Sequence, residues 1–176
     1  DGIASRVPAG SNGVIFTPWL YGERTPIDDH TVRAGFYNQS LATTRADLVR
    51  AVFEGVALNG RWLLSGVEKF VKKRLDPIRM IGGGAVSDIW CQIHADVFNR
   101  SICQVRQPIL ANVRGAGLLA AVALGEISFP EIADLIAVQK TFEPNPANRE
   151  LYDERFRIFK KIYKANRKIY RRLNKG

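Results

Sequence analysis

The chain has 176 residues and a formal net charge of +9, with 46% hydrophobic and 24% charged residues. This is the balance of an ordinary globular domain, long enough to bury a substantial core, and it excludes a disordered or fibrous chain. No apolar run reaches the ~18 residues that a membrane span needs, so we expect no membrane as a partner.

The start of the chain carries two signals. The chain begins with Asp1 and its only methionine is Met80, so we expect an upstream segment in the parent protein. The first residues lack the basic start and apolar centre of a signal peptide.

The cysteines, Cys91 and Cys103, lie in apolar settings and are too few for a disulfide framework, so we expect both to be buried and reduced in a cytoplasmic protein.

The first third of the chain predicts two short strands and a long helix. Residues 11–16 and 34–40 are apolar enough for strands, and the stretch 18–29 between them is a loop broken by prolines and a glycine. Thr44 is a candidate N-cap with Asp47 three residues later. Apolar residues then recur with a period near 3.6, which predicts a helix ending near residue 73.

A strand at 78–81 runs into three consecutive glycines at 82–84, and a helix is expected from Ser87 to Phe98. Glycine permits close approach of a ligand, and a helix N-terminus favours phosphate or another anion. The stretch is neither G-x-G-x-x-G nor a P-loop, so a nucleotide site and a simple tight turn both remain open from these residues alone.

The rest of the chain predicts a strand at 102–105, a small-residue helix at 115–124, a short helix at 131–136, a proline-bearing loop at 139–148 and a long helix at 150–173. The small side chains of the helix at 115–124 would allow it to pack very close to its neighbours. Because strands alternate with helices, we predict an α/β fold whose sheet contains parallel pairings.

The basic character lies in the last segment. Residues 149–176 hold eleven basic and three acidic side chains, which leaves the other 148 residues near neutral. Apolar stripes on the same helix favour docking on the domain with a solvated basic face. The alternative is binding to nucleic acid or to an anionic membrane surface. We expect the docked helix, and no nucleic acid as a partner.

Four motifs resemble one family. They are L-Y-G-E-R-T-P at 20–26, a signature across 36–55, I-G-G-G-A-x-S-x-x-W-x-Q-x-x-A-D at 81–96, and a small-residue helix at 114–121. Together they are similar to the C-terminal domain of the FGGY carbohydrate kinases, closest to the xylulose kinases among them, over residues 10–146. The family signature usually has Gly-Leu where this chain has Asn38-Gln39, a departure expected to alter a strand edge or turn.

The resemblance implies a ribonuclease H-like fold of the actin and hexokinase type, present in part and followed by a long C-terminal helix. Residues 1–148 would be the later part of the nucleotide-binding domain, and residues 149–176 a basic helix packed on it. The parent protein would use ATP and Mg²⁺ to phosphorylate a hydroxyl of a sugar. The expected sugar is a ketopentose, and D-xylulose is the first candidate. A catalytically degenerate nucleotide-binding or interaction module is the alternative.

The family's catalytic aspartate and phosphate-binding glycine hairpins are expected upstream, since this chain has no D-x-G-T or G-T-S segment. The resemblance therefore implies no catalytic residue here, no activity of the chain alone, and Mg²⁺ held mainly by the missing part. The missing N-terminal domain, which binds most of the sugar, is an expected partner, and a homodimer is left open.

The resemblance also implies an adenosine site at Gly83, Gly84, Ala85, Ser87 and Asp88. The two glycines would let adenine and ribose lie flat on the backbone, and Ala85 would keep the next position small. Ser87 and Asp88 would reach the base or the ribose hydroxyls, with the helix N-terminus toward the α-phosphate. A bulky residue at Gly84 is expected to block the nucleotide while leaving the fold largely intact.

Other polar residues favour structural roles. Glu23 and Arg24 are expected to lock their loop, as an ion pair or through an arginine bonded to backbone carbonyls. The run Asp28-Asp29-His30 is too compact for a typical metal site, so we expect no metal ligands. Trp90 is expected to be a packing anchor, and His94 a core or surface residue rather than a base.

Overall fold

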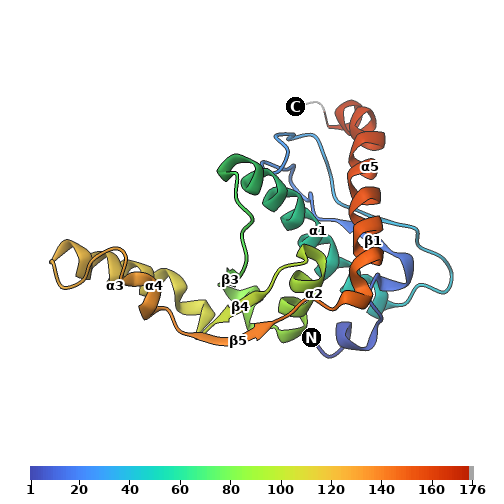
Figure 1. Cartoon of the computed structure of the whole chain (residues 1–176). Helices are drawn as coiled ribbons and strands as arrows, with labels where there is room; N and C mark the ends of the chain where they lie inside the picture. The colour runs from blue at the N-terminus through green and yellow to red at the C-terminus, as the bar shows by residue number, and fades with distance from the viewer. Residues whose placement is uncertain (175–176) are drawn as a thin grey trace.

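The computed structural model describes residues 1–174. Its main elements run in the order β1 (Ile15–Thr17), β2 (Gly35–Tyr37), α1 (Arg45–Val71), β3 (Ile78–Met80), α2 (Asp88–Phe98), β4 (Ile102–Val105), α3 (Ala111–Ala123), α4 (Ile132–Leu135), β5 (Val138–Phe142) and α5 (Arg149–Leu173). In Figure 1, α1, α2 and α5 form the body with the strands, and α3 and α4 form an arm that extends away from it.

The strands form two small sheets. β1 pairs antiparallel with β2, with Ile15 opposite Tyr37. The other sheet has the order β3-β4-β5, in which β3 and β4 run parallel, as the alternating pattern predicts. β5 is antiparallel to β4 and places Phe142 opposite Ile102. The prediction of a loop across 139–148 is therefore wrong for its first residues, because the prolines begin only after the strand has ended.

The start of α1 follows the predicted capping pattern. The Thr44 side chain accepts a hydrogen bond from the Asp47 backbone N–H, and the Asp47 carboxylate accepts one from the Thr44 backbone N–H at 2.7 Å. This reciprocal capping box satisfies two amides that a helix start otherwise leaves free. The helix ends at Val71, where Lys72 takes a left-handed conformation with φ of 53°.

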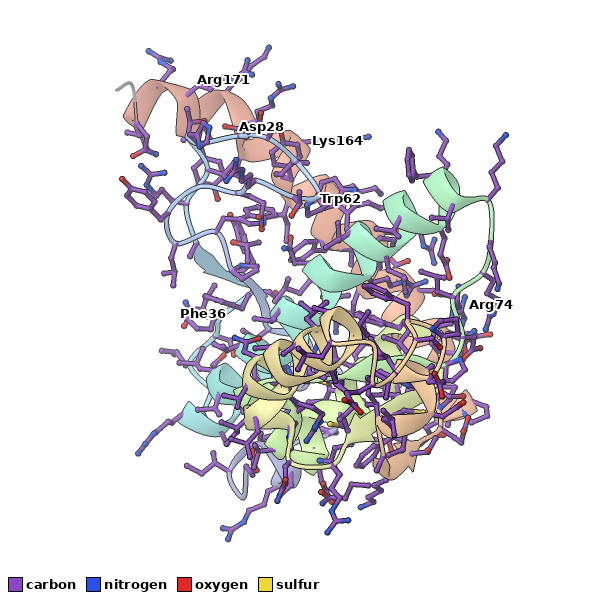
Figure 2. The ribbon with its side chains drawn as sticks, turned by 90° about the vertical axis from the view of Figure 1, so that its left-hand side faces the viewer. Asp28, Phe36, Trp62, Arg74, Lys164 and Arg171 are labelled. Atoms are coloured by element: carbon purple, nitrogen blue, oxygen red, sulfur yellow. The ribbon has the colours of Figure 1, made fainter. Side chains whose placement is uncertain are left out.

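The largest cluster of buried hydrophobic side chains joins both ends of the chain. Trp19, from the loop after β1, packs edge-on against Phe159 of α5 with ring centroids 5.3 Å apart. Ile93 of α2 lies in the same cluster. Lys164 and Arg171 of α5, labelled in Figure 2, are exposed, whereas Phe159 of the same helix is fully buried in this cluster, so the helix docks an aromatic side chain on the core and keeps basic ones in solvent.

A buried polar network lies beside this core. The Glu54 carboxylate, on α1, accepts hydrogen bonds from the Gly10 N–H, the Ser11 hydroxyl, the Arg50 guanidinium and the Tyr152 hydroxyl, all within 3.0 Å. Glu54 is 4% exposed. Because a buried charge is tolerated only when it is paired and hydrogen-bonded, this carboxylate fastens the N-terminal segment and α5 to α1.

The small-residue helix differs from its prediction. α3 begins at Ala111, four residues earlier than expected, and none of its residues is buried. Val113 and Leu119 are 73% and 55% exposed. Within the described part of the chain, α3 contacts chiefly the short turn Pro108–Leu110 that precedes it, so the close packing that its small residues permit is not made here. The arm presents an apolar surface to solvent.

Candidate functional site

The candidate site is the turn between β3 and α2. Gly82 has φ of +84°, and its N–H donates to the Pro108 carbonyl at 2.8 Å, which ties the turn to the segment after β4. A side chain at Gly83 would meet nothing within 4 Å, and Gly83 is exposed. Backbone at this point is open to an approaching flat ligand.

Gly84 faces the protein rather than solvent. A Cβ built on Gly84 would lie 2.7 Å from Cζ3 of Trp90. The Trp90 ring stacks on Phe53 with centroids 5.0 Å apart, and its Nε1–H donates to the Phe53 carbonyl. Trp90 is thus a packing anchor, as predicted. The expectation that a bulky residue at Gly84 leaves the fold intact is wrong, because the added atoms would displace this ring.

Ala85 lies beneath the turn with no exposed surface. Its carbonyl accepts a hydrogen bond from Nε2 of Gln104 at 2.7 Å and faces the Cys91 thiol at 3.7 Å. Burial raises the pKa of Cys91 to about 11. Cys91 and Cys103 are both free and buried, as predicted. A small residue at position 85 therefore closes the underside of the turn.

Ser87 is the N-cap of α2. Its hydroxyl oxygen accepts from the Trp90 backbone N–H at 3.2 Å, and the hydroxyl donates to the Asp1 carboxylate at 2.7 Å. Ser87 is 8% exposed. The side chain is therefore engaged on both sides, and what it supplies to the turn is a fixed helix start.

Asp88 is the exposed carboxylate of the site. Its Oδ2 accepts from Lys140 Nζ at 2.7 Å, and its Oδ1 accepts from Gln104 Nε2 at 3.2 Å. The hydrogen bond from Lys140 is the main reason that the pKa of Asp88 lies below its ordinary value. Sequence reasoning missed both partners, since Lys140 lay in a predicted loop and Gln104 in a strand with no motif of its own.

Two apolar hollows are lined in part by the turn or by the residue before it. One, of about 290 Å³, lies between Ile81, Val105 and the first turns of α3. The other, of about 370 Å³, is lined by Val86 and residues 107–110. Val86 and Ile109 are 54% and 67% exposed. The turn thus combines open glycine backbone, apolar walls and one carboxylate, a combination suited to a ring system carrying hydroxyl or amino donors.

The loop between β1 and β2 has structural hydrogen bonds. The Glu23 carboxylate accepts from the backbone N–H groups of Arg24 and Thr25 and from Asn59, so Glu23 locks the loop through amides rather than through an ion pair with Arg24. Asp29 accepts from Thr31 and from Tyr163 of α5. Within residues 1–174, no three His, Cys, Asp or Glu side chains are grouped for a metal ion.

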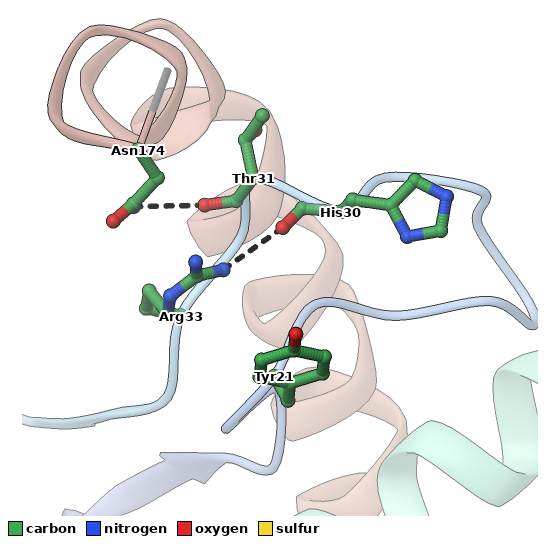
Figure 3. A pocket seen from close by; sticks show the side chains of 5 residues that line it. All are labelled: Tyr21, His30, Thr31, Arg33 and Asn174. Carbon is green, nitrogen blue, oxygen red and sulfur yellow. Dashed lines mark hydrogen bonds between the residues drawn. The ribbon is translucent and has the colours of Figure 1, made fainter. Parts of the chain in front are cut away.

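A polar pocket of about 390 Å³ opens beside the end of α5, lined by Tyr21, His30, Thr31, Arg33 and Asn174 (Figure 3). Nη1 of Arg33 donates to the carbonyls of His30 and Val32, and Nδ2 of Asn174 donates to the Thr31 carbonyl. These bonds hold the loop against α5. None of the residues predicted for the adenosine site lines this pocket.

Residues 3–124 match the family model described as the C-terminal domain of the FGGY family of carbohydrate kinases. A xylulose kinase of Staphylococcus epidermidis is 36% identical over 172 residues, which are 95% of this chain and 34% of that protein. A gluconokinase of Bacillus licheniformis is 28% identical, over 97% of this chain and 33% of that protein. The chain thus spans about a third of the length of these relatives.

Solved structures agree with this assignment. A gluconate kinase from Lactobacillus acidophilus superimposes with a TM-score of 0.85 at 31% identity, covering 98% of this chain and 35% of that one. A xylulose kinase from the same organism gives a TM-score of 0.83 at 29% identity with the same coverage. The α/β fold is therefore that of these sugar kinases. Across the described residues, no helix is both long and apolar enough to cross a membrane.

Proposed function

Because the chain belongs to the FGGY family of carbohydrate kinases, we propose that the longer protein containing it transfers the γ-phosphoryl group of MgATP to a sugar hydroxyl. The chain supplies the adenosine-binding part of that enzyme. The observation that supports this role is the glycine turn: its backbone is exposed at Gly83, its residue Val86 lines an apolar hollow, and Gln104 joins its Ala85 carbonyl to the carboxylate of Asp88.

The residues at the turn have separate tasks in this proposal. Gly83 leaves room for the flat base and ribose, whereas Gly84 and Ala85 keep the turn closely packed from below. Asp88 accepts hydrogen bonds from nucleoside donors, and Ser87 fixes the helix start whose free N–H groups favour phosphate. Phosphoryl transfer depends on positioning and electrostatic stabilisation, so orienting ATP is itself a contribution to the rate.

The catalytic aspartate, the glycine hairpins and most contacts to Mg²⁺ and sugar belong, in this proposal, to the part of the protein upstream of the chain. A ketopentose is the proposed substrate class, with D-xylulose first. In support, xylulose kinases of Staphylococcus epidermidis and Bacillus subtilis are 36% and 34% identical to this chain, whereas two gluconokinases are 28% and 32% identical, the second over 76% of the chain. In this proposal, residues 1–148 are the later part of the nucleotide-binding domain, and residues 149–176 are the basic C-terminal segment, whose helix α5 (Arg149–Leu173) packs on that domain.

The upstream part is also the proposed partner of the α3–α4 arm. α3 has no buried residue, although Val113, Leu119 and Leu124 are apolar. Leu124 and Phe129 are 79% and 65% exposed. Exposed apolar surface on this scale marks an interaction site, and a covalently linked upstream domain is the partner always present to cover it.

The test is ADP formation by the full-length protein with MgATP and a panel of ketopentoses, polyols and hexonates, with this chain alone as the control. Turnover with one sugar, and none by the chain alone, is the expected result and identifies the substrate. No turnover with any sugar, in a protein that holds the upstream hairpins and aspartate, would contradict the kinase proposal. If that inactive protein still bound ADP, the alternative function, a catalytically degenerate nucleotide-binding module, would be adopted instead of the kinase.

A further inference from the structure

Three side chains from different elements meet at the start of α2. Asp88 is the first residue of the helix, Gln104 lies in β4, and Lys140 lies in β5. Lys140 Nζ lies 2.7 Å from Asp88 Oδ2, and Gln104 Nε2 lies 3.2 Å from Asp88 Oδ1. Both oxygens of the carboxylate are thereby held in place, although Asp88 itself faces solvent.

Gln104 ties Asp88 to the backbone of the glycine turn. Its amide is 2% exposed, and the same Nε2 group also donates to the Ala85 carbonyl at 2.7 Å. Its Oε1 is buried and has no hydrogen-bond partner within the described chain. Flipping the amide would turn this oxygen toward the Ala85 carbonyl and the Asp88 carboxylate, both acceptors, so the observed orientation is the one that the surroundings permit.

Lys140 places a positive charge beside Asp88 but contributes little to the stability of the fold. The side chains of Lys140 and Asp88 are 52% and 57% exposed, and ion pairs exposed to this extent contribute little to folding. The ammonium group also lies over the Phe142 ring, 4.7 Å from its centroid, which adds a second favourable contact for the charge. The pair therefore presents a neutralised carboxylate, in one orientation, next to the turn.

We propose that Gln104 and Lys140 are positioning residues for the nucleotide: they hold the Asp88 carboxylate next to the glycine turn, to which Gln104 joins it at the Ala85 carbonyl, and they cancel its charge. This inference rests on the proposed function. Each carboxylate oxygen keeps a lone pair for a ribose hydroxyl or an amino group, since each accepts one hydrogen bond in the structure. Without Lys140, a bare carboxylate would repel the phosphates of ATP.

The experiment measures ADP affinity by calorimetry and the thermal midpoint Tm in the full-length protein. Lys140→Met is expected to weaken ADP binding about tenfold, because the Asp88 carboxylate at the site loses its counter-charge. Tm is expected to stay unchanged, because an exposed ion pair contributes little to the stability of the fold. The loss is expected to shrink as salt is added, since screening reduces the repulsion. Lys161→Met, on the exposed face of α5, is the matched control and is expected to change neither quantity.

Two further variants separate charge from fold. In the Lys140→Met background, Asp88→Asn removes the uncompensated charge and is expected to recover most of the ADP affinity. Gln104→Leu tests the contact between Gln104 and Asp88. It is expected to weaken ADP binding even when affinity is measured well below the Tm of the variant, where the protein is folded. Wild-type affinity in both Lys140→Met and Gln104→Leu would overturn the inference, whereas a wild-type protein that binds no ADP would instead overturn the proposed function.

Discussion

The Gly84 backbone lies against the Trp90 ring so closely that a Cβ atom on Gly84 would come within 2.7 Å of Trp90 Cζ3. Two contacts hold the ring in this place: it stacks on Phe53 and donates a hydrogen bond to the Phe53 carbonyl. Neighbouring glycines of one turn thus have different roles: Gly83 is open to solvent, and Gly84 makes room for the protein's own core.

This difference predicts opposite outcomes for two matched variants. Gly84→Val is expected to lower the free energy of unfolding by about 1–3 kcal/mol, the usual cost of overpacking. Gly83→Val is expected to leave stability nearly unchanged and to weaken ADP binding. Urea denaturation and calorimetry with ADP check both. A stable Gly84→Val variant would show that the ring moves aside more easily than its contacts indicate.

The Glu54 network predicts a cost for losing one hydroxyl group. Tyr152→Phe removes the donor that reaches Glu54 at 2.9 Å, and it leaves a buried carboxylate short of a hydrogen bond. Loss of a partner from a buried charged group costs about 1–3 kcal/mol. Tyr21→Phe is the control, since Tyr21 is 94% exposed. Equal stability of the two variants would contradict a supporting role for the network.

His94 predicts how stability depends on pH. Burial lowers the pKa of His94 below its ordinary value, so the folded chain keeps the imidazole neutral where the unfolded chain takes up a proton. The unfolded state then binds more protons, and the free energy of unfolding falls as pH drops below about 6.5. Above that pH the effect is absent.

His94→Gln is expected to flatten this part of the profile, as measured by denaturation between pH 7 and 5. His30→Gln is expected to keep it, because the His30 side chain is 84% exposed. An unchanged slope in His94→Gln would mean that another group controls stability in this range.

The apolar arm predicts self-association of the chain when it is made alone. Leu119→Glu, on α3, is expected to shift the isolated chain toward monomer in sedimentation experiments, since Leu119 is 55% exposed. The same change in the full-length protein is expected to reduce stability or activity if the upstream domain covers α3. Lys161→Glu, at an exposed position on α5 outside the arm, is the control. An equal shift toward monomer in this variant would argue against a role for the arm in self-association.

Much of the fold could be predicted from local signals. The capping pair Thr44 and Asp47 marks the start of α1, and glycines 82–84 mark the passage from β3 to α2. β5 was not predicted because only Phe142 among its residues is buried, so its sequence shows no alternation of apolar and polar residues. This edge strand forms through its pairing with β4 rather than through a pattern of its own.

The candidate site could be predicted only along the chain. Gly83 through Asp88 follow one another in sequence, so a motif can identify them. Gln104 and Lys140 meet Asp88 from 16 and 52 positions away, and no local spacing encodes that meeting. The expectation for Gly84 failed for the same reason, since the crowding by Trp90 depends on how α2 packs against α1.

The hydrogen bond between Glu54 and Tyr152 joins positions 98 residues apart. During synthesis, α1 leaves the ribosome long before its hydroxyl partner exists, so the nascent chain holds a carboxylate whose burial site is still incomplete. Contacts this distant in sequence form late because a long loop must close first. Premature termination before α5 would therefore remove more than one helix, because the Glu54 carboxylate and the core side chains that pack on Phe159 would lose their partners as well.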